Sequence, residues 1–262
     1  MAISADDERW FLINASPDLR AQIEAYPALQ PRKEPPRNSP IHGVLLTNAD
    51  LDHVLGLVLL REGGRIGIHA TAAVRESLED GLNFGAVLGA FSGMTWQEPG
   101  AEFAPLTVDG VPSGLVCRAI GLPGGPPRYL RQGSKFSEGH SISYQILDER
   151  TGRRLLIAAD VASVPPALQS ALEESDAVLF DGTFWSPEEL RAVSPGARTS
   201  AEMGHLTISG GSLEILRALP AARKIYLHIN NTNPILDPDS PQRAEVDAAG
   251  IIVGEDGYAF EL

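Results

Sequence analysis

Short apolar runs alternate with helix-like stretches along the chain, and this pattern predicts a layered α/β fold. Strands are expected at residues 9–13, 44–46, 66–69, 141–147, 154–159, 177–180 and 224–228. A final pair of strands is expected near the C-terminus. Helices are expected over residues 16–26, 53–60, 71–91, 165–173, 187–192, 207–218 and 240–248. The turn at residues 148–152 joins two strands into a hairpin. Hairpins mixed with helical crossovers favour one mixed sheet or two sheets covered by helices.

The size and composition of the chain fit one globular domain. It has 262 residues, of which 43% are hydrophobic and 21% charged, as in ordinary folded proteins. No repeat of 20–50 residues is visible, and no linker is long enough to divide the chain. We therefore expect a single domain over residues 1–262.

Charge and cysteine content exclude several function classes. Lys and Arg (21) minus Asp and Glu (34) gives a net charge of −13, which repels nucleic-acid phosphates. The apolar run at residues 54–60 is too short for a bilayer, which needs about 20 residues. The acidic N-terminus does not resemble a signal peptide. A single cysteine, Cys117, allows no internal disulfide and no thiolate cluster, which favours a cytoplasmic location. The charge and the short apolar run together predict no nucleic-acid partner and no membrane partner.

The segment after the strand at residues 44–46 holds the strongest candidate chemistry. Asn48, Asp50 and Asp52 alternate with small or apolar residues, so an extended turn would point them to one side. His53 follows at the start of a helix. Carboxylates beside an imidazole suit Zn(II), Mn(II) or Fe(II). The alternative is an acidic turn that caps the helix, with Asp52 as the N-cap.

Further acidic and imidazole groups stand at the ends of later strands. His228, Asp160 and Asp181 each end an apolar run, where α/β sheets place their ligands. His140 precedes a strand, and His205 lies between a polar loop and a helix. Each residue alone could be a turn or capping residue, but the joint pattern indicates a site. Fold roles are expected for the two remaining histidines, His42 and His69. No serine-nucleophile, phosphate-loop or dinucleotide motif is present.

These residues resemble the metallo-β-lactamase superfamily, and within it the PqqB family of pyrroloquinoline quinone (PQQ) biosynthesis. The superfamily has a metal-binding turn after a strand, and residues 48–53 occupy that turn. His140, Asp160 and His228 occupy the later ligand positions. The segments that resemble the PqqB family are residues 12–18, 139–141, 181–185, 203–205 and 228–236.

The resemblance implies an α/β fold, an αββα sandwich of two mixed sheets flanked by helices. The chain lacks the N-terminal strand and cysteine cluster of PqqB-like proteins, so no structural zinc is expected. Asn48 stands where the family usually has aspartate, and Asp160 stands where it often has glycine or another small residue. Asp160 therefore either restores a bridging carboxylate or closes a turn.

The expected metal centre is mononuclear. Asn48 and Asp50 replace the first histidine pair of the superfamily's turn, so Asp52, His53 and His228 are expected to gather at one ion. Two imidazoles and one carboxylate with open positions suit non-haem Fe(II) and oxygen. The further candidate ligands are Asp50, His140 and Asp160. Catalytic roles are assigned to His205, as a neutral-pH proton carrier, and to Asp181.

The resemblance also implies a reaction. The chain is expected to use Fe(II), with Zn(II) or Mn(II) as alternatives, and molecular oxygen to hydroxylate the tyrosine ring of a Glu–Tyr-derived PQQ precursor. The expected partners are therefore this small peptide-derived substrate and oxygen, and a homodimer is compatible with the sequence. Two other functions stay open: a zinc hydrolase of the same fold, and a non-enzymatic carrier that assists transport of PQQ or its precursor to the periplasm.

Overall fold

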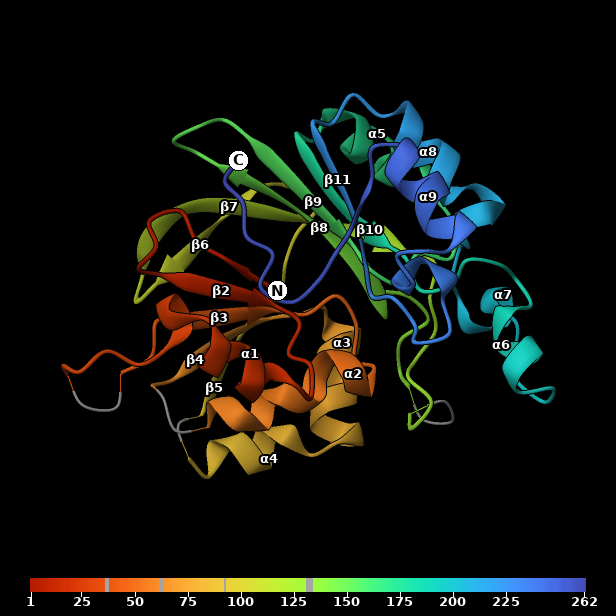
Figure 1. The fold of residues 1–262 in the computed structure, drawn as a ribbon. Coiled ribbons are helices and arrows are strands. Elements are labelled where there is room, and N and C mark those ends of the chain that lie inside the picture. Colours follow the sequence, from red (N-terminus) through yellow and green to blue (C-terminus); the bar gives the residue numbers. More distant parts are fainter. Residues whose placement is uncertain (36–37, 62–63, 92, 131–133) are drawn as a thin grey trace. The chain divides into compact units, whose positions relative to one another are not determined.

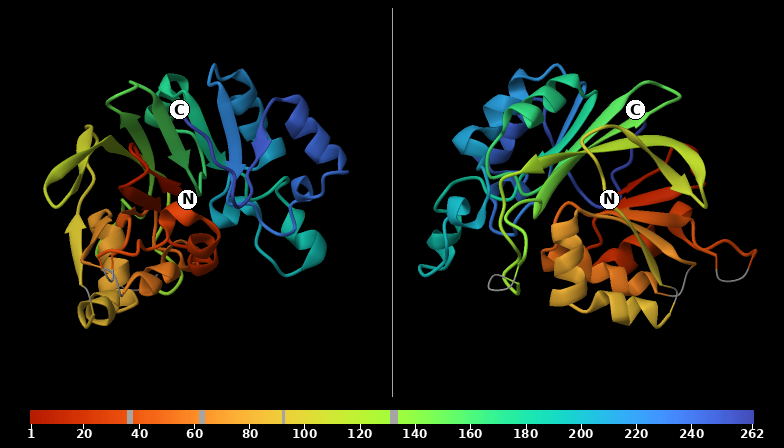
Figure 2. Two further views of the ribbon diagram at one scale, coloured as in Figure 1. Left: turned by 60° about the vertical axis from the view of Figure 1, so that its left-hand side comes forward. Right: turned by 180° about the vertical axis from the view of Figure 1, so that it is seen from behind.

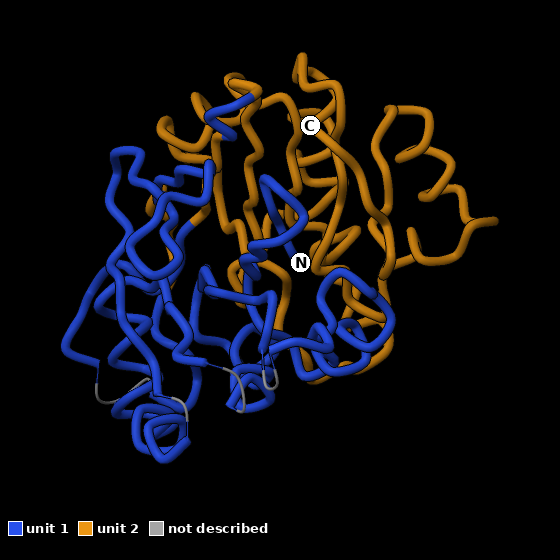
Figure 3. Tube along the Cα trace, turned by 90° about the vertical axis from the view of Figure 1, so that its left-hand side faces the viewer, with its two compact units in different colours: residues 1–119, 125–142, 148–150 blue, residues 120–124, 143–147, 151–262 orange. Residues whose placement is uncertain are grey.

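The computed structural model describes residues 1–262 apart from 36–37, 62–63, 92 and 131–133. It divides into two compact units, shown in two colours in Figure 3. Unit 1 consists of residues 1–119, 125–142 and 148–150, and unit 2 consists of residues 120–124, 143–147 and 151–262. The predicted single domain over residues 1–262 stays a prediction.

The sheet of unit 1 is mixed and has the strand order β1-β2-β3-β4-β5. Strand β1 pairs antiparallel with β2, and the other neighbours pair parallel. Successive parallel strands require crossovers on a face of the sheet, which explains the helical segments between them. The strands are β1 (Ala2–Ile3), β2 (Trp10–Ile13), β3 (Ile41–Leu45), β4 (Ile66–His69) and β5 (Met94–Gln97).

Helical segments of unit 1 gather on one face of this sheet (Figures 1 and 2). The core there joins Leu12, Val44 and Ile68 of the strands to Val54 and Val74 of the helices, and all five are buried. The segments are α1 (Leu19–Ala25), η1 (Pro27–Leu29), α2 (Leu51–Val54), η2 (Leu55–Leu60), α3 (Ala72–Glu76), η3 (Ser77–Gly81) and α4 (Phe84–Gly89).

The second sheet is also mixed, with the order β12-β11-β10-β9-β8-β7-β6. Strands β9 to β12 pair parallel, whereas β8 pairs antiparallel with β9, and β6 with β7. Strands β7 and β8 contribute residues to both units. The strands are β6 (Ala104–Val108), β7 (Val111–Leu122), β8 (Ser141–Asp148), β9 (Arg154–Ala158), β10 (Ala177–Asp181), β11 (Arg223–Leu227) and β12 (Ile252–Val253).

Helices of unit 2 pack against strands β9 to β11 (Figure 1). Leu172, Leu216 and Val246 come from three different helices and pack with Phe180 and Tyr226 of the strands in one buried cluster. The helical segments are α5 (Pro166–Glu174), α6 (Glu189–Val193), α7 (Ser200–Met203), η4 (Ile208–Ser212), α8 (Leu213–Ala218), η5 (Pro234–Leu236) and α9 (Pro241–Ala248). No helix in the described part of the chain is long and apolar enough to cross a bilayer.

Three sequence predictions need correction. The helix expected over residues 71–91 is divided at Asn83, which has a left-handed φ of 56°. The helix expected over residues 207–218 begins as the wide turn η4, because Gly211 adopts a φ of 145° and a side chain at Gly210 would collide with the Thr207 hydroxyl. The final strand pair is wrong, since residues 249–262 contain the single strand β12. After β12 the chain makes a turn at Gly257, which has a φ of 87°.

Candidate metal centre

Parallel strands of unit 2 bring four polar side chains to one edge of the sheet. Strand β10 ends at Asp181, while Asp160 and His228 follow β9 and β11. Asp160 and His228 have positive φ angles, 54° and 57°. Aspartate and histidine tolerate this left-handed conformation better than most residues, and such strain is commonest at functional sites. His205 joins the group from the loop after α7.

The Asp181 carboxylate is fully buried and anchors this group. Its Oδ2 accepts hydrogen bonds from the Val161 amide (2.9 Å) and from His205 Nδ1 (2.8 Å). Its Oδ1 accepts the amide (3.0 Å) and the hydroxyl (2.5 Å) of Thr183. Burial alone would raise the pKa of Asp181, but the hydrogen bond from His205 and the nearby His228 imidazole, whose Nδ1 is 3.6 Å from Oδ1, outweigh burial and hold the pKa far below its usual range. Asp181 is therefore an ionised acceptor.

An ionised Asp181 fixes the proton positions on both imidazoles. His205 must donate Nδ1–H to it, which leaves the lone pair on His205 Nε2. Thr183 gives its one hydroxyl proton to Asp181, so it accepts Nδ1–H from His228 at 2.8 Å. The lone pair of His228 therefore also lies on Nε2. Carboxylate partners of this kind orient histidine ligands in metalloproteins and set their tautomer.

Asp160, His205 and His228 can hold a metal ion together. One ligand atom from each residue lies within 4.8 Å of those of the other two. Asp160 Oδ1 is 3.7 Å from His205 Nε2, and the two imidazoles stack with ring centroids 5.7 Å apart. Phe184 packs edge-on against His205 with a centroid distance of 5.6 Å. Two neutral imidazoles and one carboxylate are a donor set that suits first-row divalent ions.

Close packing next to this group of side chains explains why Gly182 and Asn233 stand where they do. A side chain at Gly182 would come within 2.9 Å of Tyr226 Cβ, so only glycine lets β10 end so close to β11. Asn233 is buried and donates Nδ2–H to the carbonyl oxygens of Gly182 (2.8 Å) and Thr183 (3.3 Å). This amide ties the loop after His228 to the loop that holds Thr183.

The predicted metal-binding turn lies in unit 1 and is held mainly by hydrogen bonds. Asn48 is buried, and its Oδ1 accepts the Asp50 amide at 2.9 Å, which is a structural turn bond. Asp50 is exposed and is the N-cap of α2, so the alternative that placed Asp52 at the N-cap is wrong. Burial of Tyr129, together with the charge of Asp50, raises the pKa of Tyr129. His53 is buried, and its Nε2 is 3.7 Å from Oδ2 of the exposed Asp52.

His140 is buried in unit 1 on the loop before β8. Its Nε2 is 3.0 Å from the Phe136 carbonyl oxygen, so Nε2–H donates there and Nδ1 has the lone pair. Among the described residues, Nδ1 has no hydrogen-bond partner. The same loop is anchored by buried Glu76, which accepts the Ser134 hydroxyl at 2.8 Å. His140 thus has the protonation pattern of a metal ligand.

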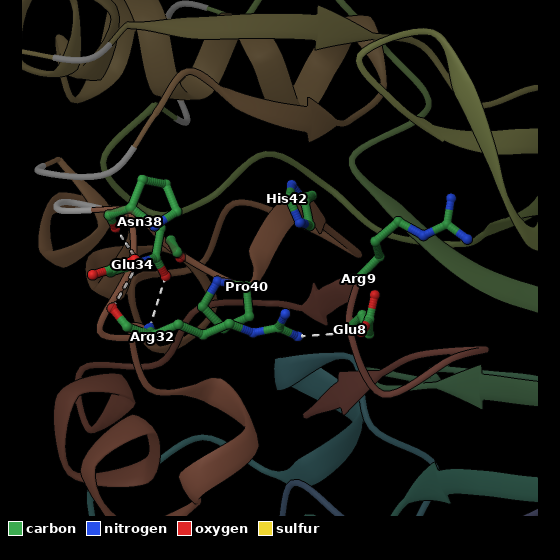
Figure 4. A pocket seen from close by; sticks show the side chains of 9 residues that line it. Glu8, Arg9, Arg32, Glu34, Asn38, Pro40 and His42 are labelled. Atoms are coloured by element: carbon green, nitrogen blue, oxygen red, sulfur yellow. Dashed lines mark hydrogen bonds and ion pairs between the residues drawn. The ribbon is translucent and has the colours of Figure 1, made fainter.

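Two other histidines have the environments of fold residues. His69 is buried in β4, and burial lowers its pKa to about 4. His42 is half-buried, and burial likewise lowers its pKa. It faces a pocket in unit 1 whose Arg32 is 3.8 Å from the carboxylate of Glu8 (Figure 4). The pocket is lined by Glu8, Arg9, Arg32, Glu34, Pro35, Asn38, Ser39, Pro40 and His42.

The structure thus gathers part of the predicted site within unit 2: Asp160, Asp181, His205 and His228. The remaining predicted site residues, Asp50, Asp52, His53 and His140, belong to unit 1. The predicted meeting of Asp52 and His53 with His228 concerns residues of both units and stays a prediction.

Three residues that hold candidate site segments in place have no recognisable signal of their own in the sequence. Thr183 connects His228 to Asp181, and Asn14 contacts His53 Nδ1 at 2.9 Å. Glu189 accepts the Thr232 hydroxyl at 2.6 Å and so supports the loop after His228. Asn14 and Thr183 lie within segments 12–18 and 181–185, whose resemblance to a known family was the available signal.

Comparisons with known proteins agree with this architecture. A family model described as a beta-lactamase superfamily domain matches residues 9–229. The coenzyme PQQ synthesis protein B of Stutzerimonas stutzeri is 41% identical over 265 residues, which cover 100% of this chain and 86% of that protein. The expected superfamily is therefore confirmed.

Solved structures give the same result for the fold. The crystal structure of a Zn²⁺-bound PqqB from Methylobacterium extorquens matches with a TM-score of 0.88 and 37% identity, covering 100% of this chain and 86% of that one. A diphosphatase of the PhnP family matches with a TM-score of 0.64 and 19% identity, over 98% of this chain and 80% of that one, and shows the fold alone. The predicted metallo-β-lactamase fold of two mixed sheets flanked by helices is confirmed.

Proposed function

The chain belongs to the coenzyme PQQ synthesis protein B family of the beta-lactamase superfamily, and on that premise we propose that it is a metal-dependent hydroxylase of PQQ synthesis. The proposed substrate is a Glu–Tyr-derived precursor whose tyrosine ring gains one atom of molecular oxygen as a hydroxyl group. A two-electron reductant and two protons convert the other oxygen atom into water. The observation that carries the proposal is the pair of imidazoles, His205 and His228, that the buried Asp181 carboxylate orients beside Asp160.

The chemistry of these donors fits Fe(II). Two imidazoles and one carboxylate leave coordination positions open for other ligands, which is typical of non-haem iron oxygenases. Fe(II), when bound, would supply the activation of oxygen. Asp160, His205 and His228 would hold the ion, and Asp52 and His53 remain predicted ligands. In this proposal Asp181 and Thr183 are positioning residues, since they act on the imidazoles and keep their Nε2 lone pairs available.

A zinc-dependent hydrolase is the second candidate, and one observation favours it. The PqqB from Methylobacterium extorquens was crystallised with Zn²⁺ bound, and imidazole and carboxylate donors also suit zinc. Zinc does not change its oxidation state, so it cannot carry oxygen chemistry. The identity of the ion that supports turnover therefore separates the two candidates.

Anaerobic reconstitution tests the proposal. The metal-free full chain is loaded with Fe(II), Zn(II) or Mn(II), and oxygen uptake is followed with a Glu–Tyr dipeptide and ascorbate as the two-electron reductant, while mass spectrometry detects one added oxygen atom on the ring. We expect uptake with Fe(II) alone, its loss in His228→Ala and its retention in the matched control His42→Ala. Turnover with zinc alone, or uptake that ignores the metal, would refute the hydroxylase. PQQ binding that survives metal removal would favour the carrier.

A further inference from the structure

Asn14 in unit 1 adopts a strained backbone conformation and contacts two functional segments. It follows strand β2 with a φ of 57°, in the left-handed region that asparagine tolerates. Its side chain lies against Thr47 at the end of β3 and against His53 in α2. Residues held in this way are commonest where the surrounding structure needs one particular side-chain position.

The Thr47 backbone fixes which way the Asn14 amide faces. The Thr47 N–H can only donate, and it lies 2.9 Å from Asn14 Oδ1. The Thr47 hydroxyl is also 3.2 Å from the same oxygen. If the amide were turned, its NH₂ group would face the Thr47 N–H, and two donors would meet. The Asn14 oxygen therefore stays on the Thr47 side.

The orientation of Asn14 determines the proton position on His53. Asn14 Nδ2 is 2.9 Å from His53 Nδ1, and an amide NH₂ can only donate, so Nδ1 must accept. The second Nδ2 hydrogen is donated to the Thr47 hydroxyl at 2.9 Å. The ring proton of neutral His53 then lies on Nε2. The Asp52 carboxylate, 3.7 Å from Nε2, also favours a proton there.

We infer that Asn14 is a positioning residue that keeps metal-free His53 in the Nε2–H tautomer. His53 then offers a proton at Nε2, whereas a metal ion bound at Nε2 needs a lone pair. Engagement of His53 by an ion at Nε2 moves the ring proton to Nδ1, where it meets the Asn14 NH₂ group. The proton is then donated to the Thr47 hydroxyl, 3.2 Å away, or the Asn14 amide turns and loses its bond to the Thr47 N–H. Ion binding at His53 is thereby coupled to a proton shift in unit 1.

Long-range ¹H–¹⁵N NMR of the metal-free full chain tests this inference, since it separates protonated from unprotonated ring nitrogens. Spectra are recorded near pH 9, above the ordinary imidazole pKa of about 6.5, and His53 is assigned by the signal lost in His53→Gln. We expect an unprotonated Nδ1 and a protonated Nε2. A protonated Nδ1 in the unmodified chain overturns the inference whatever any variant does.

A single substitution should reverse the tautomer. In Asn14→Asp, the carboxylate offers one oxygen to the Thr47 N–H and the other to His53 Nδ1–H, so the two ring signals exchange their character. Asn38→Asp is the matched control, because Asn38 contacts only its own loop in the interactions described and should leave the His53 signals unchanged. A folded Asn14→Asp chain whose His53 signals do not change would also overturn the inference.

Discussion

The two units hold their histidines with different partners. In unit 2 a buried carboxylate, Asp181, receives Nδ1–H of His205 directly and that of His228 through Thr183. In unit 1 an amide, Asn14, donates to Nδ1 of His53. A carboxylate can only accept a hydrogen bond and an amide NH₂ can only donate one. Nε2 therefore has a lone pair in His205 and His228, but a proton in His53. The histidine pair of unit 2 is prepared for a metal ion, whereas His53 of unit 1 presents a proton.

The partners also differ in electrostatic cost. Asp181 has no exposed surface, and its charge is tolerated because four donors surround it. Asn14 is neutral and incurs no comparable desolvation cost. The unit 2 cluster is therefore the more sensitive to substitution, and substitutions of decreasing expected effect test this difference.

Replacing Asp181 should have the largest effect. Asp181→Asn puts an NH₂ group among four donors, so buried partners of Asp181 lose their acceptor. We expect the free energy of unfolding to fall by about 3–5 kcal/mol, measured by denaturant titration of the metal-free chain. Asn14→Ala removes a neutral partner and should cost about 1–3 kcal/mol. Equal losses in the two variants would contradict the proposed difference between the clusters.

The Thr183 hydroxyl should have an intermediate effect that is specific to metal binding. Thr183→Val keeps the shape but cannot accept Nδ1–H from His228, so the ring is no longer fixed with its Nε2 lone pair available. Metal affinity should fall about 10–100-fold, as measured by competition with a chelating dye. Thr183→Ser keeps the hydroxyl and should bind as the unmodified chain does. Equal metal affinities of Thr183→Val and Thr183→Ser would show that the hydroxyl does not connect Asp181 to His228.

A partly buried surface carboxylate of unit 2, Asp176, should have the smallest effect. Asp176 accepts the Arg154 amide (2.8 Å), and this bond, with the Arg153 ion pair, lowers its pKa despite partial burial. A lowered folded-state pKa stabilises the fold above about pH 4. This contribution is lost as the pH falls through the folded-state value.

Asp176→Asn should therefore cost less than about 1 kcal/mol at pH 7, because the pair is solvent-screened. It should also flatten the decline of stability below about pH 4. Denaturant titrations at several pH values measure both effects. A cost as large as that of Asp181→Asn would show that burial is not what separates these two aspartates.

Much of the fold could be read from local pattern. The strand at residues 66–69 and the helices near residues 166–174 and 241–248 lie where alternating apolar and polar positions place them. The irregular start of the helix expected over residues 207–218 does not follow from this pattern, because it depends on Thr207, whose hydroxyl leaves no room for a side chain at Gly210. A hydrophobic pattern records which face is buried, but it does not record such close approaches.

The sequence alone determined the superfamily, the layered α/β architecture and the residue types of the site, because these follow from apolar periodicity, charge and short segments. Tertiary structure decided which residues cooperate. The site residues of unit 2 span 68 positions of the chain, from Asp160 to His228, and include Asp181 and Thr183. Parallel strand pairing brings them to one edge of the sheet. Hydrogen-bond partners then decide which ring nitrogen keeps its proton, and a partner 39 positions away, as Asn14 is from His53, leaves no local pattern.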